Sequence, residues 1–271
     1  MIQLHELHLK DLQNPIHPSL YESHKDYHIF ILRLPELWEG KANILALRSK
    51  EFWKTKGRFF SYPFVIVKDE VFYYDRKLEE LTRFDNGFKD LYLFLDEKIN
   101  AYMEDIEIAH DKIAFIEESL YKKQSFSPME RWHVLKKELS RTERVITKAV
   151  DVFERFNTKH NFSETNLDNE FSDLHEHLER SLRSTIAANT QLDDIYRYYN
   201  IQTNDRLNRS IYLLTIISVI FLPLNLVVGF FGMNTGGLPF QHNYGTLDAF
   251  IAMIIFAVAL TAAVLWKIKS K

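Results

Sequence analysis

The chain has 271 residues, of which 46% are hydrophobic and 26% charged, and its formal net charge at pH 7 is −3. This composition is typical of a folded protein, and it shows no basic patch of the kind that binds nucleic acid, which argues against nucleic acid as a partner. The sequence contains no cysteine, so it has neither disulfides nor thiolate metal ligands.

Residues 1–90 alternate short β-rich runs with turns. Such runs occupy residues 29–34, 43–48 and 59–75. The last run mixes aromatic and β-branched residues and is interrupted by a Lys-Asp-Glu tripeptide, which predicts a β-hairpin. We therefore expect a small α+β unit here.

Residues 91–162 are predicted to form an antiparallel pair of helices. Residues 95–123 and 128–159 are rich in helix formers and repeat apolar residues at spacings of three and four. The segment between them ends in Ser127-Pro128, which is a favourable start for a helix.

A long helical stalk is predicted over residues 163–210. No Gly or Pro occurs from Ser163 until Pro223, and a helix of about sixty residues spans about 90 Å, which is far more than a bilayer needs. An apolar stripe follows the stalk, and it suits either self-association or packing on the helix pair of the same subunit. The stripe consists of Phe171, Leu174, Leu178, Leu182, Ile186, Leu192, Ile195 and Tyr199.

Residues 211–271 are predicted to form a transmembrane hairpin. Two apolar runs, 211–231 and 247–266, are each long enough to cross a hydrocarbon core of about 30 Å. Lys and Arg residues lie before the first run and after the second, whereas residues 232–246 between the runs contain neither. Because positive charges stay on the cytoplasmic side, both termini should be cytoplasmic and the connecting loop should face outward.

One face of the first span gathers its strongly hydrogen-bonding residues, apart from Tyr212, at alternating spacings of three and four. We call this set the polar seam: Asn208, Ile211, Thr215, Ser218, Leu222, Asn225 and Gly229. Polar groups facing lipid are costly, so the seam should face other helices or water. It would serve either as hydrogen-bonding contact between packed helices or as the lining of a pore. A pore is favoured because the seam connects a stalk to an unusual loop, and one span per chain then requires an oligomeric ring.

Residues 214–234, LTIISVIFLPLNLVVGFFGMN, resemble the first membrane helix and loop of the CorA family of divalent-cation transporters. The Gly-Met-Asn element lies at the outer end of the penultimate span and is followed by a second span and a basic tail. The resemblance is continuous over about the last seventy residues, and upstream only the order of elements is similar. It implies an α+β cytoplasmic domain with a long helical stalk and two C-terminal transmembrane helices, in a funnel-shaped homopentamer of a bacterial-type plasma membrane.

The resemblance also implies roles for individual positions. Asn234 would form a ring at the outer mouth that meets the hydrated cation, with Gly232 and Met233 shaping its loop. Asn225 would form a second polar ring, unless it makes a hydrogen bond between helices, and Asn208 would form one at the cytoplasmic entry. Mg²⁺ releases its inner waters reluctantly, so neutral oxygens that contact the water shell suit it. The hydrophobic constrictions would be formed by Ile211, Leu214 and Leu222.

The loop after Asn234 differs from the usual magnesium-transporter pattern. It continues Thr-Gly-Gly-Leu-Pro-Phe-Gln-His without the acidic residue that typical CorA loops carry. This segment resembles the ZntB branch, which implies zinc transport, although that branch often has Ile or Val where this chain has Met233. His242 would attract zinc or be merely solvated. The expected function is transport of Mg²⁺, with Co²⁺ and Ni²⁺ as further substrates, and ZntB-like zinc transport is the alternative; no cofactor is expected besides the transported cation.

The stalk carries five acidic residues that bear on regulation: Asp168, Glu170, Asp173, Glu176 and Glu179. In the CorA family, carboxylates between cytoplasmic subunits bind cations that hold the pore shut, and a count without gaps places Asp173 near one of them. The alternative is an ordinary solvated face. His175 and His177 lie two residues apart and so on different helix faces, which makes them a poor metal-binding pair.

Two other classes of function fit the sequence less well. An enzyme is not expected, because the sequence shows no nucleophile–base constellation, Gly-rich phosphate loop or His/Glu metal motif. A non-transporting membrane anchor, whose stalk and α+β unit act as a scaffold, remains as a remote alternative. The sequence leaves open which ion is physiological, whether transport is passive or coupled to protons, and whether cytoplasmic cation gates the pore.

Overall fold

The computed structural model describes residues 4–36, 53, 57–121, 128–160, 162, 167–232 and 244–269. Its internal contacts divide the chain into two compact units, Met1–Arg197 and Tyr198–Lys271. Each unit is described by itself.

The first unit is built on a five-stranded antiparallel sheet in which each strand pairs with the next along the chain. Phe30 lies opposite Phe64, and Ile29 lies opposite Val65. The predicted strand at residues 29–34 and the predicted hairpin at 59–75 are confirmed, whereas the run at 43–48 lies outside the described residues. The strands are β1 (Leu20–Ser23), β2 (His28–Glu36), β3 (Arg58–Val67), β4 (Glu70–Asp75) and β5 (Glu80–Arg83).

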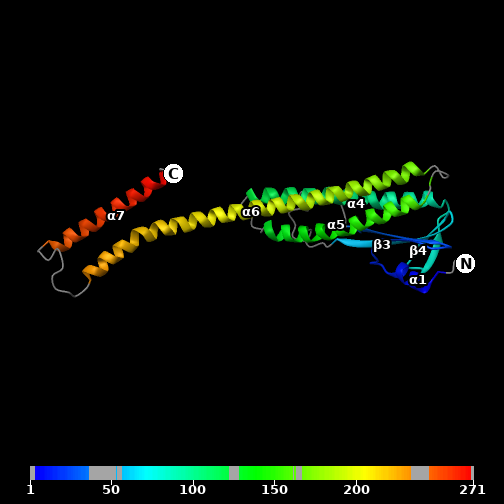
Figure 1. Cartoon of the computed structure of the whole chain (residues 1–271), viewed down its shortest axis with the longest axis horizontal. Helices are drawn as coiled ribbons and strands as arrows, with labels where there is room; N and C mark the ends of the chain where they lie inside the picture. The colour runs from blue at the N-terminus through cyan, green and yellow to red at the C-terminus, as the bar shows by residue number, and fades with distance from the viewer. Residues whose placement is uncertain are drawn as a thin grey trace. The chain divides into compact units, whose positions relative to one another are not determined.

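Helices cover both faces of this sheet, with α1 (Glu6–Gln13) on one side and α4 (Phe88–Tyr121) and α5 (Pro128–Lys159) on the other (Figure 1). Successive residues of a strand point to opposite faces, so both sets of side chains are buried. Phe30 stacks on Phe156 of α5 with ring centroids 4.3 Å apart. On the opposite face, Ile29 packs in a cluster with Leu12 of α1.

Helices α4 and α5 are the predicted helix pair, and α5 has the predicted bounds. Helix α4 begins at Phe88 rather than at residue 95. Gly87 has a φ of +52°, and a Cβ there would lie 3.0 Å from the carbonyl oxygen of Asp69, so glycine fits this turn. The carboxylate of Asp90 accepts a 2.8 Å hydrogen bond from the N–H of Asn86, which closes the start of the helix.

Helix α6 (Asp168–Phe231) packs against the helix pair over its first part. The predicted start at Ser163 lies outside the described residues, and the helix begins at Asp168. Trp132 of α5 donates a 2.7 Å hydrogen bond from Nε1 to the carbonyl of Leu192. Most of the apolar stripe is buried inside the chain, which favours packing on the chain's own helix pair, although Ile186 remains 44% exposed.

The second unit contains the end of α6, from Tyr198, and helix α7 (Gly245–Lys269), which runs back in the opposite direction (Figure 1). Among the described residues, α6 is the one helix long and apolar enough to cross a membrane, and none of its most apolar stretch is buried. The second predicted span, 247–266, falls within α7, where the described apolar stretch Phe250–Leu260 is shorter. A second membrane crossing therefore stays a prediction.

Candidate functional site

The polar seam lies on α6 within the second unit, and every one of its residues is exposed in the single chain. The three residues predicted to form constrictions are more than half exposed: Leu222 at 71%, Leu214 at 63% and Ile211 at 52%. Residues on other faces are equally open, for example Leu226 at 72%. An apolar helix with this much exposed surface requires lipid or further protein around it.

The seam's hydroxyl groups bond to their own helix. Thr215 Oγ1 donates a 2.8 Å hydrogen bond to the carbonyl of Ile211, and Ser218 Oγ donates a 2.9 Å bond to the carbonyl of Leu214. A hydroxyl has one proton and two lone pairs, so each oxygen keeps acceptor capacity after this bond. The seam therefore offers oxygen acceptors to whatever faces it.

Two glycines lie at the C-terminal end of α6. A Cβ added at Gly229 would meet nothing within 4 Å, so nothing in the described chain requires a glycine there. Gly232 follows the end of α6, where its N–H donates a 2.9 Å bond to the carbonyl of Val228, and a Cβ would approach that oxygen to 3.2 Å. Met233 and Asn234 lie outside the described residues.

Asp173 lies in the first unit, near the start of α6. Its side chain is 56% exposed, and its Oδ1 lies 3.6 Å from Nε2 of His177. His175 points elsewhere and stacks on Phe153, as the two-residue spacing predicted. The structure thus brings His177 close to Asp173 but leaves His175 packed against Phe153.

The next acidic residues of the stalk have basic partners one helical turn further on. Glu176 pairs with Arg180 at 3.1 Å, and Glu179 pairs with Arg183 at 3.2 Å. Pairs at this spacing are common on solvated helix faces and stabilise a helix by only about 0.2–0.5 kcal/mol each. The solvated-face interpretation therefore describes Glu176 and Glu179 well.

The sequence analysis missed the electrostatic interaction between Lys112, which is buried on α4, and Glu138, which is partly buried on α5. Burial lowers the pKa of Lys112 to about 7 and raises the pKa of Glu138. Glu138 also accepts a 3.1 Å hydrogen bond from the N–H of Gly57. Since Lys112 is only 2% exposed and lies in the helical core, we assign this pair a structural role. Lys112 and Glu138 occur at helical spacings that ordinary surface charges also have, so the sequence carried no signal that Lys112 is buried.

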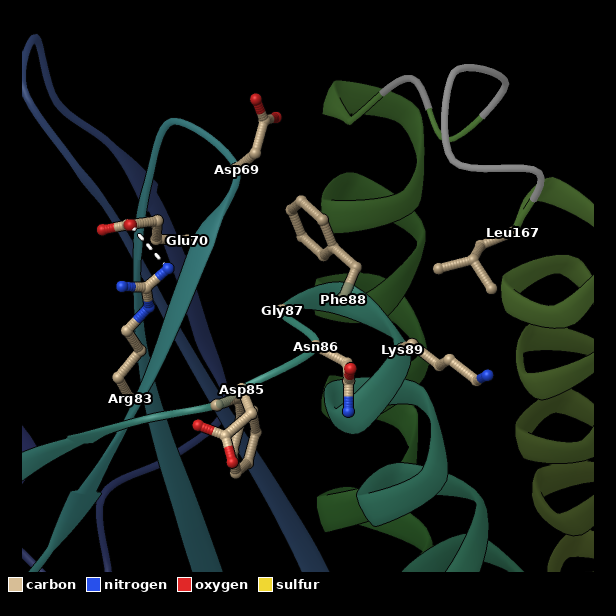
Figure 2. Close-up of a pocket in the computed structure, with 10 residues that line it drawn as sticks. Asp69, Glu70, Arg83, Asp85, Asn86, Gly87, Phe88, Lys89 and Leu167 are labelled. Atoms are coloured by element: carbon tan, nitrogen blue, oxygen red, sulfur yellow. Dashed lines mark ion pairs between the residues drawn. The ribbon is translucent and has the colours of Figure 1, made fainter.

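A cavity of about 540 Å³ lies beside the start of α4, with Asp69 and Glu70 on one side and Leu167 on the other (Figure 2). Its polar groups largely serve each other. Arg83 pairs with Glu70 at 2.8 Å, and Asn86, also in the lining, donates to the carboxylate of Asp90. The cavity thus mixes both signs of charge and does not gather a catalytic constellation from its described lining.

Comparison with known proteins agrees with this geometry. A sequence profile described as CorA-like Mg²⁺ transporter protein matches residues 2–270. The putative metal ion transporter YfjQ of Bacillus subtilis is 26% identical over 178 residues, covering 65% of this chain and 54% of YfjQ. The zinc transport protein ZntB of Yersinia pseudotuberculosis is 30% identical over 182 residues, covering 65% and 52%. The chain thus spans about half the length of the curated relatives it matches.

The fold has a solved counterpart in the complete structure of the CorA magnesium transporter from Methanocaldococcus jannaschii. The two chains superpose with a TM-score of 0.75 at 17% identity, over 96% of this chain and 82% of the other. The likeness shows that the α+β unit, the helix pair and the long helix α6 form a CorA-like fold. Together with the profile, which matches almost the whole sequence, it leads to one conclusion: the chain belongs to the family of CorA-like Mg²⁺ transporter proteins.

Proposed function

We propose that this chain is one subunit of an oligomeric membrane transporter for divalent metal cations. The observation that carries the proposal is the polar seam, whose amide and hydroxyl side chains lie along one face of the apolar end of α6. Family membership supports the same function. A single α6 cannot enclose a pore, so several copies would surround one, and the family resemblance favours five.

The seam's chemistry suits a cation that keeps its water shell. The hydrogens of waters around a cation point outward, so the wall needs hydrogen-bond acceptors. Thr215 and Ser218 commit their protons to backbone carbonyls, which leaves lone pairs for those waters. Asn208 and Asn225 add amide oxygens on the same face. Neutral acceptors bind a hydrated ion weakly at several positions, as conduction requires.

Apolar rings would close the pathway. Ile211, Leu214 and Leu222 carry large apolar side chains that are more than half exposed in the single chain. Repeated around an axis, such side chains form constrictions that gate by expelling water. At the outer mouth, Asn234 would supply an amide ring that meets the incoming hydrated cation, with Gly232 and Met233 shaping the loop.

The proposed topology has two membrane crossings and cytoplasmic termini in a bacterial-type plasma membrane. Helix α7 has 25 residues, which corresponds to about 37 Å and is enough to cross a hydrocarbon core. Basic residues precede the first crossing and follow the second, and none lies between them. This distribution favours a cytoplasmic first unit and an outward-facing loop.

Mg²⁺ is the proposed ion, with Zn²⁺ as the second candidate. The family profile and the solved relative are named for magnesium, whereas several of the similar sequences, ZntB proteins of different bacteria, are named for zinc transport. The loop favours zinc, because no acidic residue follows Asn234 before Asp248, in contrast to typical CorA loops. Competition among Mg²⁺, Co²⁺, Ni²⁺ and Zn²⁺ in one uptake assay would separate the two candidates.

Uptake by liposomes tests the proposal. Purified protein reconstituted into liposomes should load them with Mg²⁺ or Zn²⁺ down a gradient, and empty liposomes should not load. Absence of flux for every divalent ion would favour the membrane-scaffold alternative. Gly229→Ala adds a test of assembly, because a Cβ there meets nothing in the single chain. An altered oligomer size in that variant would place the seam at contacts between subunits.

A further inference from the structure

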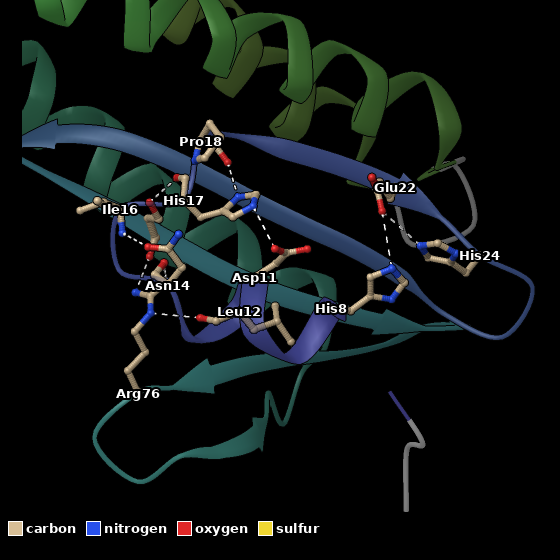
Figure 3. A network of polar contacts seen from close by, with 11 residues as sticks. His8, Asp11, Leu12, Asn14, Ile16, His17, Pro18, Glu22, His24 and Arg76 are labelled. Carbon is tan, nitrogen blue, oxygen red and sulfur yellow. Dashed lines mark hydrogen bonds and ion pairs between the residues drawn. The ribbon is translucent and has the colours of Figure 1, made fainter. Parts of the chain in front are cut away.

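Three metal-ligating side chains converge on the face of the sheet that carries α1. His8 comes from α1, whereas Glu22 and His24 come from the end of β1 and the turn that follows it (Figure 3). The Oε2 atom of Glu22 lies 3.8 Å from Nε2 of His8 and 3.4 Å from Nε2 of His24. One ligand atom from each residue lies within 4.8 Å of the other two.

Local structure fixes the backbone of all three residues. Glu22 and His24 are two residues apart, so they point to the same side of an extended chain. The N–H of His24 donates a 2.9 Å bond to the carbonyl of Tyr27, which closes the turn between β1 and β2. Helix α1 is held on the sheet by Leu12, which is fully buried. The cluster is therefore built from anchored elements.

The ligand set matches a borderline transition metal. Zn²⁺ binds imidazole nitrogen and carboxylate oxygen at about 2.0–2.2 Å, so ligand atoms around a tetrahedral ion lie about 3.3–3.5 Å apart. The two separations from Glu22 Oε2, 3.4 and 3.8 Å, are close to this range. Small side-chain rotations would complete the approach of His8 to His24. Mg²⁺ demands octahedral oxygen ligands, so this set disfavours it.

A second layer of contacts orients His8. Its Nδ1 lies 2.8 Å from the hydroxyl oxygen of Tyr27, and the N–H of His5 donates to the same oxygen at 3.3 Å. When Nδ1 carries the proton and donates it to Tyr27, the lone pair of Nε2 points to the cluster. Metal-bound histidines usually have such a partner on the other ring nitrogen, which fixes the tautomer.

The cluster is open to metal from solution. The side chains of Glu22 and His24 are 42% and 35% exposed, whereas that of His8 is 16% exposed. Three protein ligands leave a fourth tetrahedral position for water. A bound ion would also cross-link α1 to the β1–β2 turn.

We propose that His8, Glu22 and His24 form a binding site for Zn²⁺ or a similar late first-row cation on the first unit. The site is separate from the polar seam, and the proposal does not rest on transport. Bound metal holds α1 against the sheet, and Tyr27 acts as a positioning residue for His8.

Metal binding to the full-length protein in detergent tests this site, with Zn²⁺ as the probe. Equilibrium dialysis against Zn²⁺ in the presence of excess Mg²⁺ should show one ion fewer per chain in His8→Ala and His24→Ala than in wild type. His17→Ala is the matched control, because His17 also faces a carboxylate, that of Asp11 at 3.4 Å, outside the three-residue cluster. It should bind as wild type does. Tyr27→Phe should weaken binding by about 10- to 100-fold, as loss of an outer-shell partner does.

Two further readouts separate this site from any cation bound elsewhere. Co²⁺ held by two imidazoles in a four-coordinate site absorbs visible light much more strongly than Co²⁺ surrounded by water, so wild type should show that absorption and His24→Ala should not. Zn²⁺ should also raise the unfolding temperature of wild type more than that of His24→Ala. Equal Zn²⁺ stoichiometry in wild type and both histidine variants, or displacement of the ion by Mg²⁺, would overturn the proposal.

Discussion

His177 Nε2 lies 3.6 Å from Asp173 Oδ1, one helical turn further along α6. The carboxylate proposed to sense cytoplasmic cation thus already has a partner within its own chain. Asp173 is nonetheless 56% exposed, and a partially exposed carboxylate can still meet a cation that a second subunit helps to bind. If Asp173 senses cation, His177 and a divalent ion would therefore compete for its carboxylate.

Replacement of Asp173 tests this regulatory proposal. In wild type, Mg²⁺ bridging between subunits should protect the stalk from proteolysis, because it neutralises facing carboxylates. In Asp173→Ala that dependence should weaken, and flux should respond less to internal Mg²⁺. Glu176→Ala is the control, since Glu176 already pairs with Arg180 at 3.1 Å. A wild-type Mg²⁺ response in Asp173→Ala would make Asp173 an ordinary surface charge.

Thr185→Val should destabilise the first unit. The hydroxyl of Tyr102 on α4 lies 2.6 Å from Thr185 Oγ1, and both residues are fully buried. The substitution keeps the shape but leaves the phenol without that partner, which costs about 1–3 kcal/mol. Thr190→Val is the control, because Thr190 is exposed and its hydroxyl donates a 2.9 Å hydrogen bond to the carbonyl of Ile186 in its own helix. Denaturant unfolding of the full chain in detergent measures the difference, and equal midpoints for the two variants would refute the prediction.

Stability of the first unit should fall as the pH drops from 7 to 5. Burial, with the nearby His28 and Lys159, lowers the pKa of His160 to about 4, and the opposing effect of Asp69 is smaller. The unfolded chain therefore takes up a proton at this position near pH 6.5, before the folded chain does, and stability is lost from there down to about pH 4. The pKa of His28 is lowered too, again mainly by burial.

The expected loss for His160 is about 1 kcal/mol, less than the full pKa shift would give, because the ring is only partly buried and water screens its charge. His160→Gln should reduce the pH dependence of the unfolding midpoint. His133→Gln, an exposed position on α5, should leave it unchanged. An unaltered slope in His160→Gln would assign the effect to other groups.

Leu222→Asn should raise the basal flux of the reconstituted protein. A polar ring lets water persist where an apolar ring expels it, and Leu222 is 71% exposed on the seam in the single chain. Leu222→Val keeps the ring apolar and should retain the low basal flux of wild type. Ile211→Asn gives an independent test at another of the proposed constrictions. If both Asn variants stay closed, the gate lies elsewhere on the pathway.

The sequence predicted the regular elements well because their periodicity is strong. Helix α5 matches its predicted bounds, and α6 continues without a break through Pro223. The early start of α4 was missed because its signal lies in the Gly87 turn and in a bond between Asn86 and Asp90 rather than in apolar spacing.

Side-chain partners from distant segments were the hardest to predict. The sequence analysis did not identify Glu22, His24 and His8 as a cluster, because nothing in the sequence connects the end of β1 to His8 on another element. The apolar stripe illustrates the same limit, because burial against α4 and burial between subunits demand the same residues. The burial of most of the stripe inside the chain, for example at Phe171 and Leu174, distinguishes the two uses.

Divalent-cation flux through the proposed outer asparagine ring tests the central claim most directly. Wild type, Asn234→Ala and the neighbouring control Thr235→Ala would be reconstituted at equal oligomer content, and uptake of Mg²⁺ and Zn²⁺ would be followed down a gradient. The account predicts uptake by wild type and Thr235→Ala, and little or none by Asn234→Ala, because that variant loses the amide ring while keeping the oligomer. Unchanged uptake by Asn234→Ala, or no uptake of either ion by wild type, would contradict it.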